Sequence, residues 1–101
     1  MTRTKPYYSQ KEIRSYISDR KVEIRSSALQ NAQKDFGWGI DDIYKALSKL
    51  PLRCWYKSEP RYNNPQIWVD YYRCPDLNGE NIYTHFYVDN DRLIIDSFKR
   101  Q

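Results

Sequence analysis

Basic and phenolic side chains recur along the second half of the chain, and residues of these types can cleave RNA without a metal ion. The set is the following: Lys57, Arg73, Tyr83, His85, Tyr87, Lys99 and Arg100. In such a reaction the RNA supplies its own 2′-hydroxyl as the nucleophile. The protein helps to remove that proton, stabilises the charge on the phosphorane and protonates the departing 5′-oxygen. The alternative interpretation is that these residues are solvated strand positions, which are often basic or Tyr.

Other common catalytic and cofactor signatures are missing from the sequence. With three glycines, the chain has no glycine-rich loop that could cradle a phosphate group. No Ser or Cys lies in a nucleophile motif, and the acidic residues are scattered without the spacing of metal ligands. Two cysteines and one histidine do not complete a zinc site unless an acid joins them. No metal site and no cofactor are therefore predicted.

The two cysteines, Cys54 and Cys74, are expected to be reduced and partly buried. The segments that hold them are expected to pair about a turn near residues 61–64. With that pairing, Cys54 faces the region of Tyr71 and not Cys74.

The positive charge of the chain is concentrated near its start. The whole chain has 17 Lys and Arg against 13 Asp and Glu, which gives a net charge of +4. Residues 1–25 contain seven basic against three acidic side chains, so the whole excess lies in this quarter. A basic patch suits a polyanion or an acidic protein partner, whereas the alternative is an ordinary solvated surface.

Before Pro51 the apolar residues recur at helical spacing, and three helices are expected there. Ser9 and Glu12 form a capping box for the first helix, and Gly37 is suited to end the second. The short segment 21–25 alternates in polarity and is expected to be extended, as an edge strand. The expected helical ranges are 9–19, 26–37 and 41–50.

After Pro51 the pattern changes to the alternation of strands. Ile67, Val69 and Tyr71 fall on one face of such a strand, and the residues between them fall on the other. The expected strands are 53–59, 66–73, 81–88 and 92–99. Short connections imply a mostly antiparallel sheet with the helices on one face. The predicted fold class is therefore α+β, as a single domain over residues 1–101.

No membrane-spanning segment or secretory signal is predicted. The longest apolar runs are a few residues long, as at Leu93–Ile95, whereas a spanning helix needs about 20. The start of the chain, Met1–Pro6, is basic but has no apolar stretch behind it. The chain is expected to work in the cytoplasm, with no membrane partner.

Several short motifs follow one another along the chain in a recognisable order. They are residues 25–32 (RSSALQNA), 36–37 (FG), 55–58 (WYKS), 67–73 (IWVDYYR) and 97–99 (SFK). In this order and spacing the chain resembles the motility quorum-sensing regulator (MqsR) toxins over nearly its whole length. Small insertions fall only around residues 75–79 and 89–91.

The resemblance implies a RelE-like fold and the activity of an mRNA interferase of a type II toxin–antitoxin pair. Such an enzyme is a ribosome-independent endoribonuclease that cuts mRNA at short GCU-like sites. Its expected products carry 2′,3′-cyclic phosphate and 5′-hydroxyl ends. The implied partners are the mRNA substrate and a cognate, MqsA-like antitoxin that itself binds DNA.

The resemblance also carries site residues over to this sequence. The family's catalytic positions match Lys57 in the Tyr-Lys-Ser motif, Tyr83 at the start of the third long strand and Lys99 in the terminal Ser-Phe-Lys motif. Lys57 and Lys99 are expected to stabilise the phosphorane, and Tyr83 to position or transfer a proton. Further contacts with phosphate or base are predicted for three residues: Arg73, His85 and Tyr87.

Val69 departs from the family pattern, which has Gln directly after Ile-Trp. A valine side chain neither donates nor accepts a hydrogen bond, so one family function is missing or has moved to His85 or Gln66. Since Val69 alternates with Ile67 and Tyr71, the three side chains share a face. That face lies either over the active site or in the core.

Two other functions fit parts of the sequence. A toxin-like fold without nuclease activity would bind RNA or only a protein partner, and Val69 is the feature that favours it. A DNA-binding regulator is disfavoured because no helix-turn-helix with a basic recognition helix is found. The helix expected after Asp41 begins with two acids, which suits DNA poorly.

Overall fold

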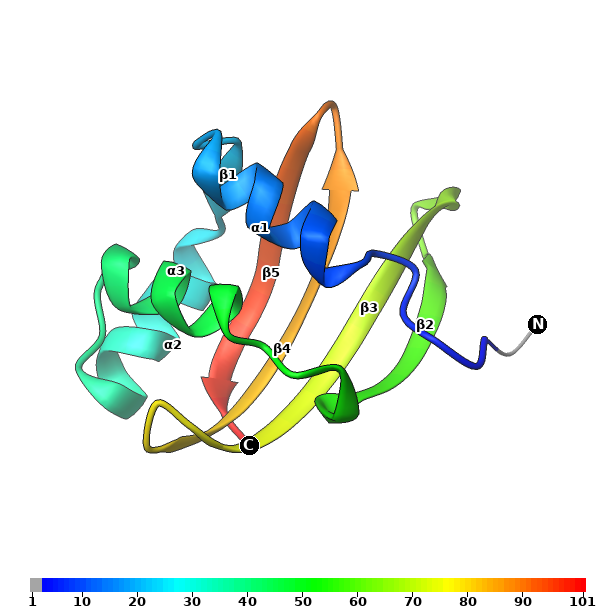
Figure 1. Cartoon of the computed structure of the whole chain (residues 1–101). Helices are drawn as coiled ribbons and strands as arrows, with labels where there is room; N and C mark the ends of the chain where they lie inside the picture. Colours follow the sequence, from blue (N-terminus) through cyan, green and yellow to red (C-terminus); the bar gives the residue numbers. More distant parts are fainter. Residues whose placement is uncertain (1–2) are drawn as a thin grey trace.

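Three helices come first along the chain and four long strands follow (Figure 1). The computed structural model describes residues 3–101. The helices are α1 (Gln10–Ser18), α2 (Ser26–Phe36) and α3 (Ile40–Ser48), followed by a short 3-10 helix, η1 (Leu52–Cys54). The strands are β1 (Val22–Ile24), β2 (Trp55–Arg61), β3 (Asn64–Leu77), β4 (Glu80–Asp89) and β5 (Arg92–Arg100). The predicted change from helix to strand near Pro51 is confirmed.

The strands form one five-stranded sheet in the order β1-β5-β4-β3-β2. The pairs β2–β3, β3–β4 and β4–β5 are antiparallel, as short hairpin connections require. Strand β1 pairs in parallel with β5, and the long connection from β1 through α2, α3 and the other strands supplies the crossover that such a pair needs. The predicted α+β class and the extended edge segment at residues 21–25 are therefore confirmed.

The helix ends follow local sequence signals. The side-chain oxygen of Ser9 accepts from the backbone N–H of Glu12, and the Glu12 carboxylate accepts from the N–H of Ser9, so the predicted capping box is present. Helix α2 ends at Gly37, whose φ of 72° is left-handed. Helix α3 begins after Gly39 rather than after Asp41, because the carboxylate of Asp42 accepts from the Gly39 N–H.

All three helices lie on one face of the sheet, and the core fills the space between (Figure 1). The apolar residues with no exposed surface come from both layers: Ala28, Ala32, Ile43, Ala46, Ile82, Phe86, Leu93, Ile95 and Phe98. On β3 and β4 these inward positions alternate with Tyr71, Arg73, Tyr83 and His85. The face without helices, here named the open face, therefore carries the polar and aromatic strand residues. No helix within residues 3–101 is long and apolar enough to cross a bilayer.

Buried Asp70 ties the segment before α1 to the sheet. Its two carboxylate oxygens accept from the backbone N–H groups of Tyr7 and Tyr8, at 3.0 and 2.9 Å, and the Ser58 hydroxyl also donates to it. The Tyr8 hydroxyl donates to the carbonyl of Trp68. Burial raises the pKa of Asp70, while the three donors lower it. The segment consequently crosses the sheet at β3 in a fixed position (Figure 1).

Cys54 and Cys74 form a disulfide, with 4.9 Å between their Cα atoms. The expectation of two reduced thiols, and of Cys54 opposite Tyr71, is therefore wrong. The reason is register: the β2–β3 ladder shifts near Pro60 and again between Trp55 and Lys57. These shifts move the start of β2 toward the end of β3, which brings Cys54 beside Cys74.

Candidate active site

Two hollows open side by side on the open face of the sheet. The first, the hairpin hollow, has a volume of about 440 Å³ and lies under the β2–β3 turn; it is lined by Glu59, Pro60, Arg61, Tyr62, Asn63, Val69, Tyr71, His85 and Asp96. The second, the terminal hollow, measures about 430 Å³ and lies near the C-terminus; it is lined by Arg73, Tyr83, His85, Ser97, Lys99, Arg100 and Gln101. His85 lines both, so the two hollows form one continuous polar surface.

Cross-strand pairing brings three of the predicted site residues into one row. Arg73 on β3 is opposite Tyr83 on β4, and Tyr83 is opposite Lys99 on β5. The Lys99 ammonium lies 5.5 Å from the centre of the Tyr83 ring. Two positive charges therefore flank a phenol in the terminal hollow, an arrangement that suits a phosphate group.

A second row lies beside the first. Lys57 on β2 is opposite Tyr71 on β3, and Tyr71 is opposite His85 on β4. The Lys57 ammonium lies 4.4 Å from the centre of the Tyr71 ring, and the Tyr71 and His85 rings are 5.0 Å apart. Lys57 is thus connected to the site through the ring of Tyr71, although it does not line either hollow.

Lys57 and Lys99 differ in their partners. Lys57 forms an ion pair with Glu59 at 2.7 Å, and this hydrogen bond raises the pKa of the lysine. Lys57 therefore keeps its proton at neutral pH. Lys99 lies near the end of the chain, but the backbone around it is fixed. The N–H of Arg100 donates to Asp35 of α2, and the N–H of Gln101 donates to the carbonyl of Asn81.

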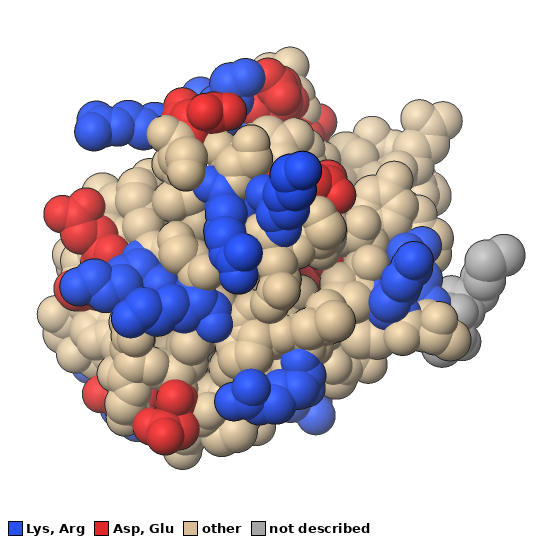
Figure 2. Space-filling view, viewed as in Figure 1, with Lys and Arg blue, Asp and Glu red and all other residues tan. Residues whose placement is uncertain are grey.

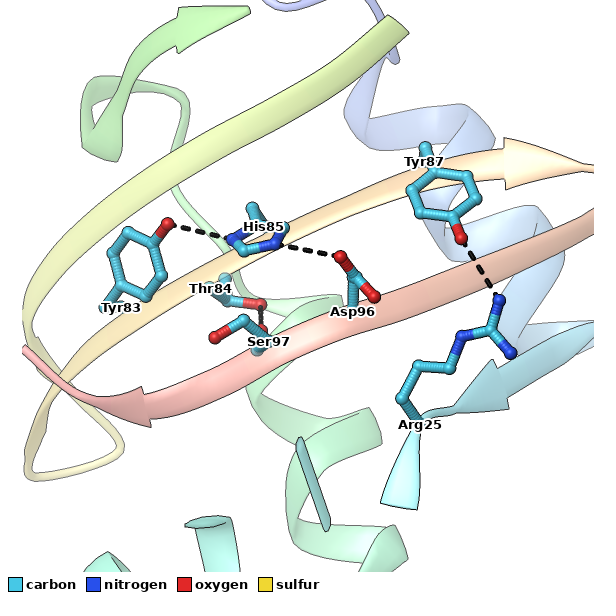
Figure 3. Close-up of polar contacts among 7 residues, drawn as sticks. All are labelled: Arg25, Tyr83, Thr84, His85, Tyr87, Asp96 and Ser97. Carbon is cyan, nitrogen blue, oxygen red and sulfur yellow. Dashed lines mark hydrogen bonds and ion pairs between the residues drawn. The ribbon is translucent and has the colours of Figure 1, made fainter. Parts of the chain in front are cut away.

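Tyr83, His85 and Asp96 form a hydrogen-bonded chain across β4 and β5 (Figure 3). The Tyr83 hydroxyl lies 2.8 Å from Nδ1 of His85, and Nε2 of His85 lies 3.1 Å from the Asp96 carboxylate. Burial raises the pKa of Tyr83 to about 12, and the neighbouring phenols of Tyr56 and Tyr71 add to the effect. Burial also lowers the pKa of His85, against the opposing effect of Asp96. At neutral pH the phenol is protonated and the imidazole is neutral.

A β-bulge turns Asp96 toward His85. His85 is opposite Ser97 and Phe86 is opposite Ile95, so Asp96 is an extra residue without a partner on β4. Because of the bulge, Ile95 points into the core while Asp96 lines the hairpin hollow. The hydroxyl of buried Thr84 donates to the carbonyl of Ser97 and supports this irregular stretch of β5 (Figure 3).

Val69 lines the hairpin hollow together with Tyr71, His85 and Asp96. Its side chain is 5% exposed and lies on the same face as Tyr71. Val69 belongs to the cluster of buried apolar residues and also lines the hollow, so each of the two predicted placements holds in part. The wall of the hollow is therefore apolar at the position where the resemblance led us to expect an amide.

Tyr87 contacts two arginines, Arg25 and Arg61, at the open face. Its ring is 1% exposed and lies under the guanidinium of Arg61, which is 4.4 Å from the ring centre. Its hydroxyl accepts from Arg25 at 3.2 Å (Figure 3). Neither arginine was predicted as a site residue, and both present charge where Tyr87 was expected to contact RNA.

The basic residues of the first quarter do not gather on one side of the molecule. Arg14 on α1 donates to the carbonyl of Ser48 in the helix layer, whereas Arg25 reaches Tyr87 on the open face. On the helix-covered side, Lys and Arg side chains are spread over separate places with Asp and Glu among them (Figure 2). The excess charge of residues 1–25 is therefore divided between the two faces.

Comparison with known protein families identifies the family to which the chain belongs. Residues 5–100 match the family model described as "Motility quorum-sensing regulator, toxin of MqsA". No curated protein gives a significant match to the chain. Within residues 3–101, no three His, Cys, Asp or Glu side chains are grouped so that they could hold a metal ion. Since the family model covers nearly the whole chain, this protein belongs to the MqsR toxin family and is a toxin of a toxin–antitoxin system.

Proposed function

We propose that this toxin is a metal-independent, ribosome-independent endoribonuclease that cuts mRNA at short GCU-like sites. The observation that carries the proposal is the row Arg73, Tyr83 and Lys99 in the terminal hollow, with His85 beside it. The row combines two fixed positive charges with groups that donate or accept a proton. These are the requirements of an intramolecular attack by a ribose 2′-hydroxyl on the adjacent phosphate.

Three cationic side chains, Lys57, Arg73 and Lys99, are placed to stabilise the negative charge that develops during this reaction. In the phosphorane, negative charge grows on the non-bridging oxygens. The Lys99 ammonium and the Arg73 guanidinium flank Tyr83 and would contact these oxygens. Lys57 would approach from β2, where the ion pair with Glu59 keeps it protonated. Removing one such charge should cost roughly 10²–10³ in rate.

The cognate partner would be an MqsA-like, DNA-binding antitoxin that inhibits the toxin in the cytoplasm. Family membership supports an antitoxin partner. The antitoxin could bind the same hydrogen-bonding and charged groups of the open face that RNA would contact.

A second candidate function is binding of RNA or of the antitoxin without cleavage. Val69 favours it, because the wall of the hairpin hollow has an apolar side chain where the family has a hydrogen-bonding amide. Both functions use the same open face, so only the products distinguish them.

The test is incubation of the purified chain with a long RNA, with and without EDTA, followed by analysis of the fragment ends. Fragments with 2′,3′-cyclic phosphate and 5′-hydroxyl ends in both samples are expected. Lys99→Ala should reduce their formation roughly 10²–10³-fold. Lys45→Ala is the matched control, because Lys45 lies exposed in the last turn of α3, outside both hollows. Intact RNA, or cleavage only without EDTA, would contradict the proposal.

A further inference from the structure

Two hydrogen bonds join Tyr83 to His85 and His85 to Asp96. Membership of the family does not assign a role to this row of contacts. Tyr83 lines the terminal hollow, where a phosphate would bind, and His85 lies between the two hollows. Asp96 is held at the far end by the bulge of β5. The three side chains thus form a line from the substrate position to a carboxylate (Figure 3).

We propose that Tyr83, His85 and Asp96 are a proton relay that removes the proton of the attacking 2′-hydroxyl. The proposal rests on the proposed nuclease function and names the base that this reaction needs. Tyr83 is the catalytic residue of the relay because it is the group that would touch the ribose. His85 and Asp96 act through it as positioning residues.

The hydrogen-bond partners fix the direction of the relay. An ionised carboxylate only accepts, so the contact with Asp96 places the proton of neutral His85 on Nε2. The other nitrogen, Nδ1, then has a free lone pair and accepts from the Tyr83 hydroxyl. Tyr71 packs against His85 with ring centres 5.0 Å apart and limits the rotation of the imidazole. The relay is therefore set before RNA arrives.

Tyr83 alone is a poor base, since burial raises its pKa to about 12 and a phenolate is rare at neutral pH. Because the Tyr83 hydroxyl is hydrogen-bonded to His85, it can accept the 2′-hydroxyl proton while it passes its own proton to Nδ1 of His85. His85 is suited to receive that proton because burial lowers its pKa and leaves it neutral. Lys57 is unsuited to the same task, because Glu59 raises the pKa of the lysine.

The step balances in protons and electron pairs. The O2′–H bond breaks and its proton moves to the oxygen of Tyr83, while the Tyr83 proton moves to Nδ1 of His85. The freed O2′ electron pair forms the bond to phosphorus, and the phosphorus–O5′ bond breaks. The leaving O5′ takes a proton from the ammonium of Lys99. Exchange with water afterwards removes the proton from His85 and restores that of Lys99.

The groups that surround His85 set the pH at which the relay works. Asp96 on β5 raises the pKa of His85, whereas burial and the charges of Lys99 and Lys57 lower it. Tyr71 on β3 and Tyr83 on β4 contact the ring as neutral phenols. Four further charged residues line the hollows around it: Glu59, Arg61, Arg73 and Arg100. Loss of the Asp96 charge should therefore lower the pKa of His85 further.

The test is the pH dependence of kcat/KM for RNA cleavage by the parent, His85→Gln and Asp96→Asn chains. The parent should lose activity on the acid side, as His85 becomes protonated and can no longer accept. His85→Gln should cut roughly 10²-fold more slowly and lose this acid limb. Asp96→Asn should also be slower, with the acid limb moved to lower pH. Asp91→Asn is the control, because Asp91 on the β4–β5 turn pairs with Lys21, away from the hollows.

A measurement without RNA separates failure of the relay from failure of the nuclease function. Nitrogen NMR of the free protein should show the His85 proton on Nε2, which checks the relay without any activity. A parent chain that cuts no RNA would overturn the nuclease function and the relay together. A parent chain that cuts RNA, with the acid limb retained in His85→Gln or with Asp96→Asn indistinguishable from Asp91→Asn, would overturn the relay alone. A proton found on Nδ1 would do the same.

Discussion

Asp70 and Asp96 are two carboxylates of the same sheet with opposite surroundings. Asp70 on β3 has no exposed surface and accepts from Tyr7, Tyr8 and Ser58. Asp96 on β5 has 42% of its side chain exposed and contacts His85 at the edge of a hollow. Asp70 faces the segment that precedes the helices, whereas Asp96 lies on the open face.

The difference shows how one residue type serves two purposes. Around Asp70 both carboxylate oxygens are used, and the donors include backbone groups far away in sequence, so the network fixes the path of the chain. Around Asp96 the carboxylate orients a titratable ring that remains open to a ligand. Removing Asp70 should therefore affect folding, whereas removing Asp96 should affect chemistry.

The largest expected effect on stability comes from Asp70→Ala. The change leaves three donors without an acceptor, two of them backbone N–H groups, and should lower the free energy of unfolding by roughly 4 kcal/mol. Asp96→Ala should cost less than about 1 kcal/mol, because its partner pair is partly exposed. Chemical denaturation of both variants measures this contrast, and equal losses would refute it.

The disulfide, like Asp70, should affect folding stability rather than the chemistry of the site. It joins Cys54 and Cys74 across a separation of 20 residues, and closing such a loop stabilises a fold by roughly 3 kcal/mol. A thiol reductant, or the double change to Ser, should lower the melting temperature by roughly 10–20 °C. Cleavage at low temperature should keep its site preference. A melting temperature unaffected by reductant would show that the bond contributes little.

Val69→Gln sharpens the chemical side of the comparison. Val69 is buried among apolar residues but also lines the hairpin hollow, so the longer amide can extend into space of about 440 Å³ beside His85 and Asp96. Cleavage should become faster or change its site preference, with a stability loss below about 1 kcal/mol. The assay compares cleavage rate, fragment pattern and melting temperature with those of the parent. A lower melting temperature with an unaltered pattern would remove this position from the site.

The smallest expected effect is the contribution of His85 to stability at acid pH. Burial lowers the pKa of His85 from its ordinary 6.5, so at mildly acid pH the unfolded chain binds a proton that the folded chain does not. The free energy of unfolding should therefore fall as the pH drops below 6.5, and it should recover above it. In His85→Gln this part of the pH dependence should disappear. Identical curves for both chains would contradict the assignment.

The fold was predictable from the sequence where its signals are local. The capping box of Ser9 and Glu12, the left-handed Gly37 and the alternation around Val69 each involve neighbouring residues, and each corresponds to the element expected. Strand β3 is longer than predicted and reaches Leu77, because the pairing with β4 resumes after an irregularity, in residues that resemble a loop in sequence. Strand β2 begins two residues later than predicted, because residues 53–54 belong to η1.

The main errors and omissions concern contacts between residues that are distant in the sequence. The shifts in the β2–β3 ladder bring Cys54 to Cys74, and no local pattern encodes them. The bulge at Asp96 turns this side chain to the open face, where unbroken alternation from buried Phe98 would place it in the core. The partner of Asp70 lies more than 60 residues away in the first segment. The sequence predicts candidate site residues on the strands, but it does not predict the contacts between them.

The most direct test of the central claim uses an RNA with one 2′-deoxy nucleotide on the 5′ side of a scissile phosphate. If the open face activates the RNA's own 2′-hydroxyl, cleavage at that position should disappear. A neighbouring site with its hydroxyl intact should still give 2′,3′-cyclic phosphate and 5′-hydroxyl ends. Continued cleavage at the deoxy position, with 5′-phosphate ends, would show that water is the nucleophile and would contradict the account.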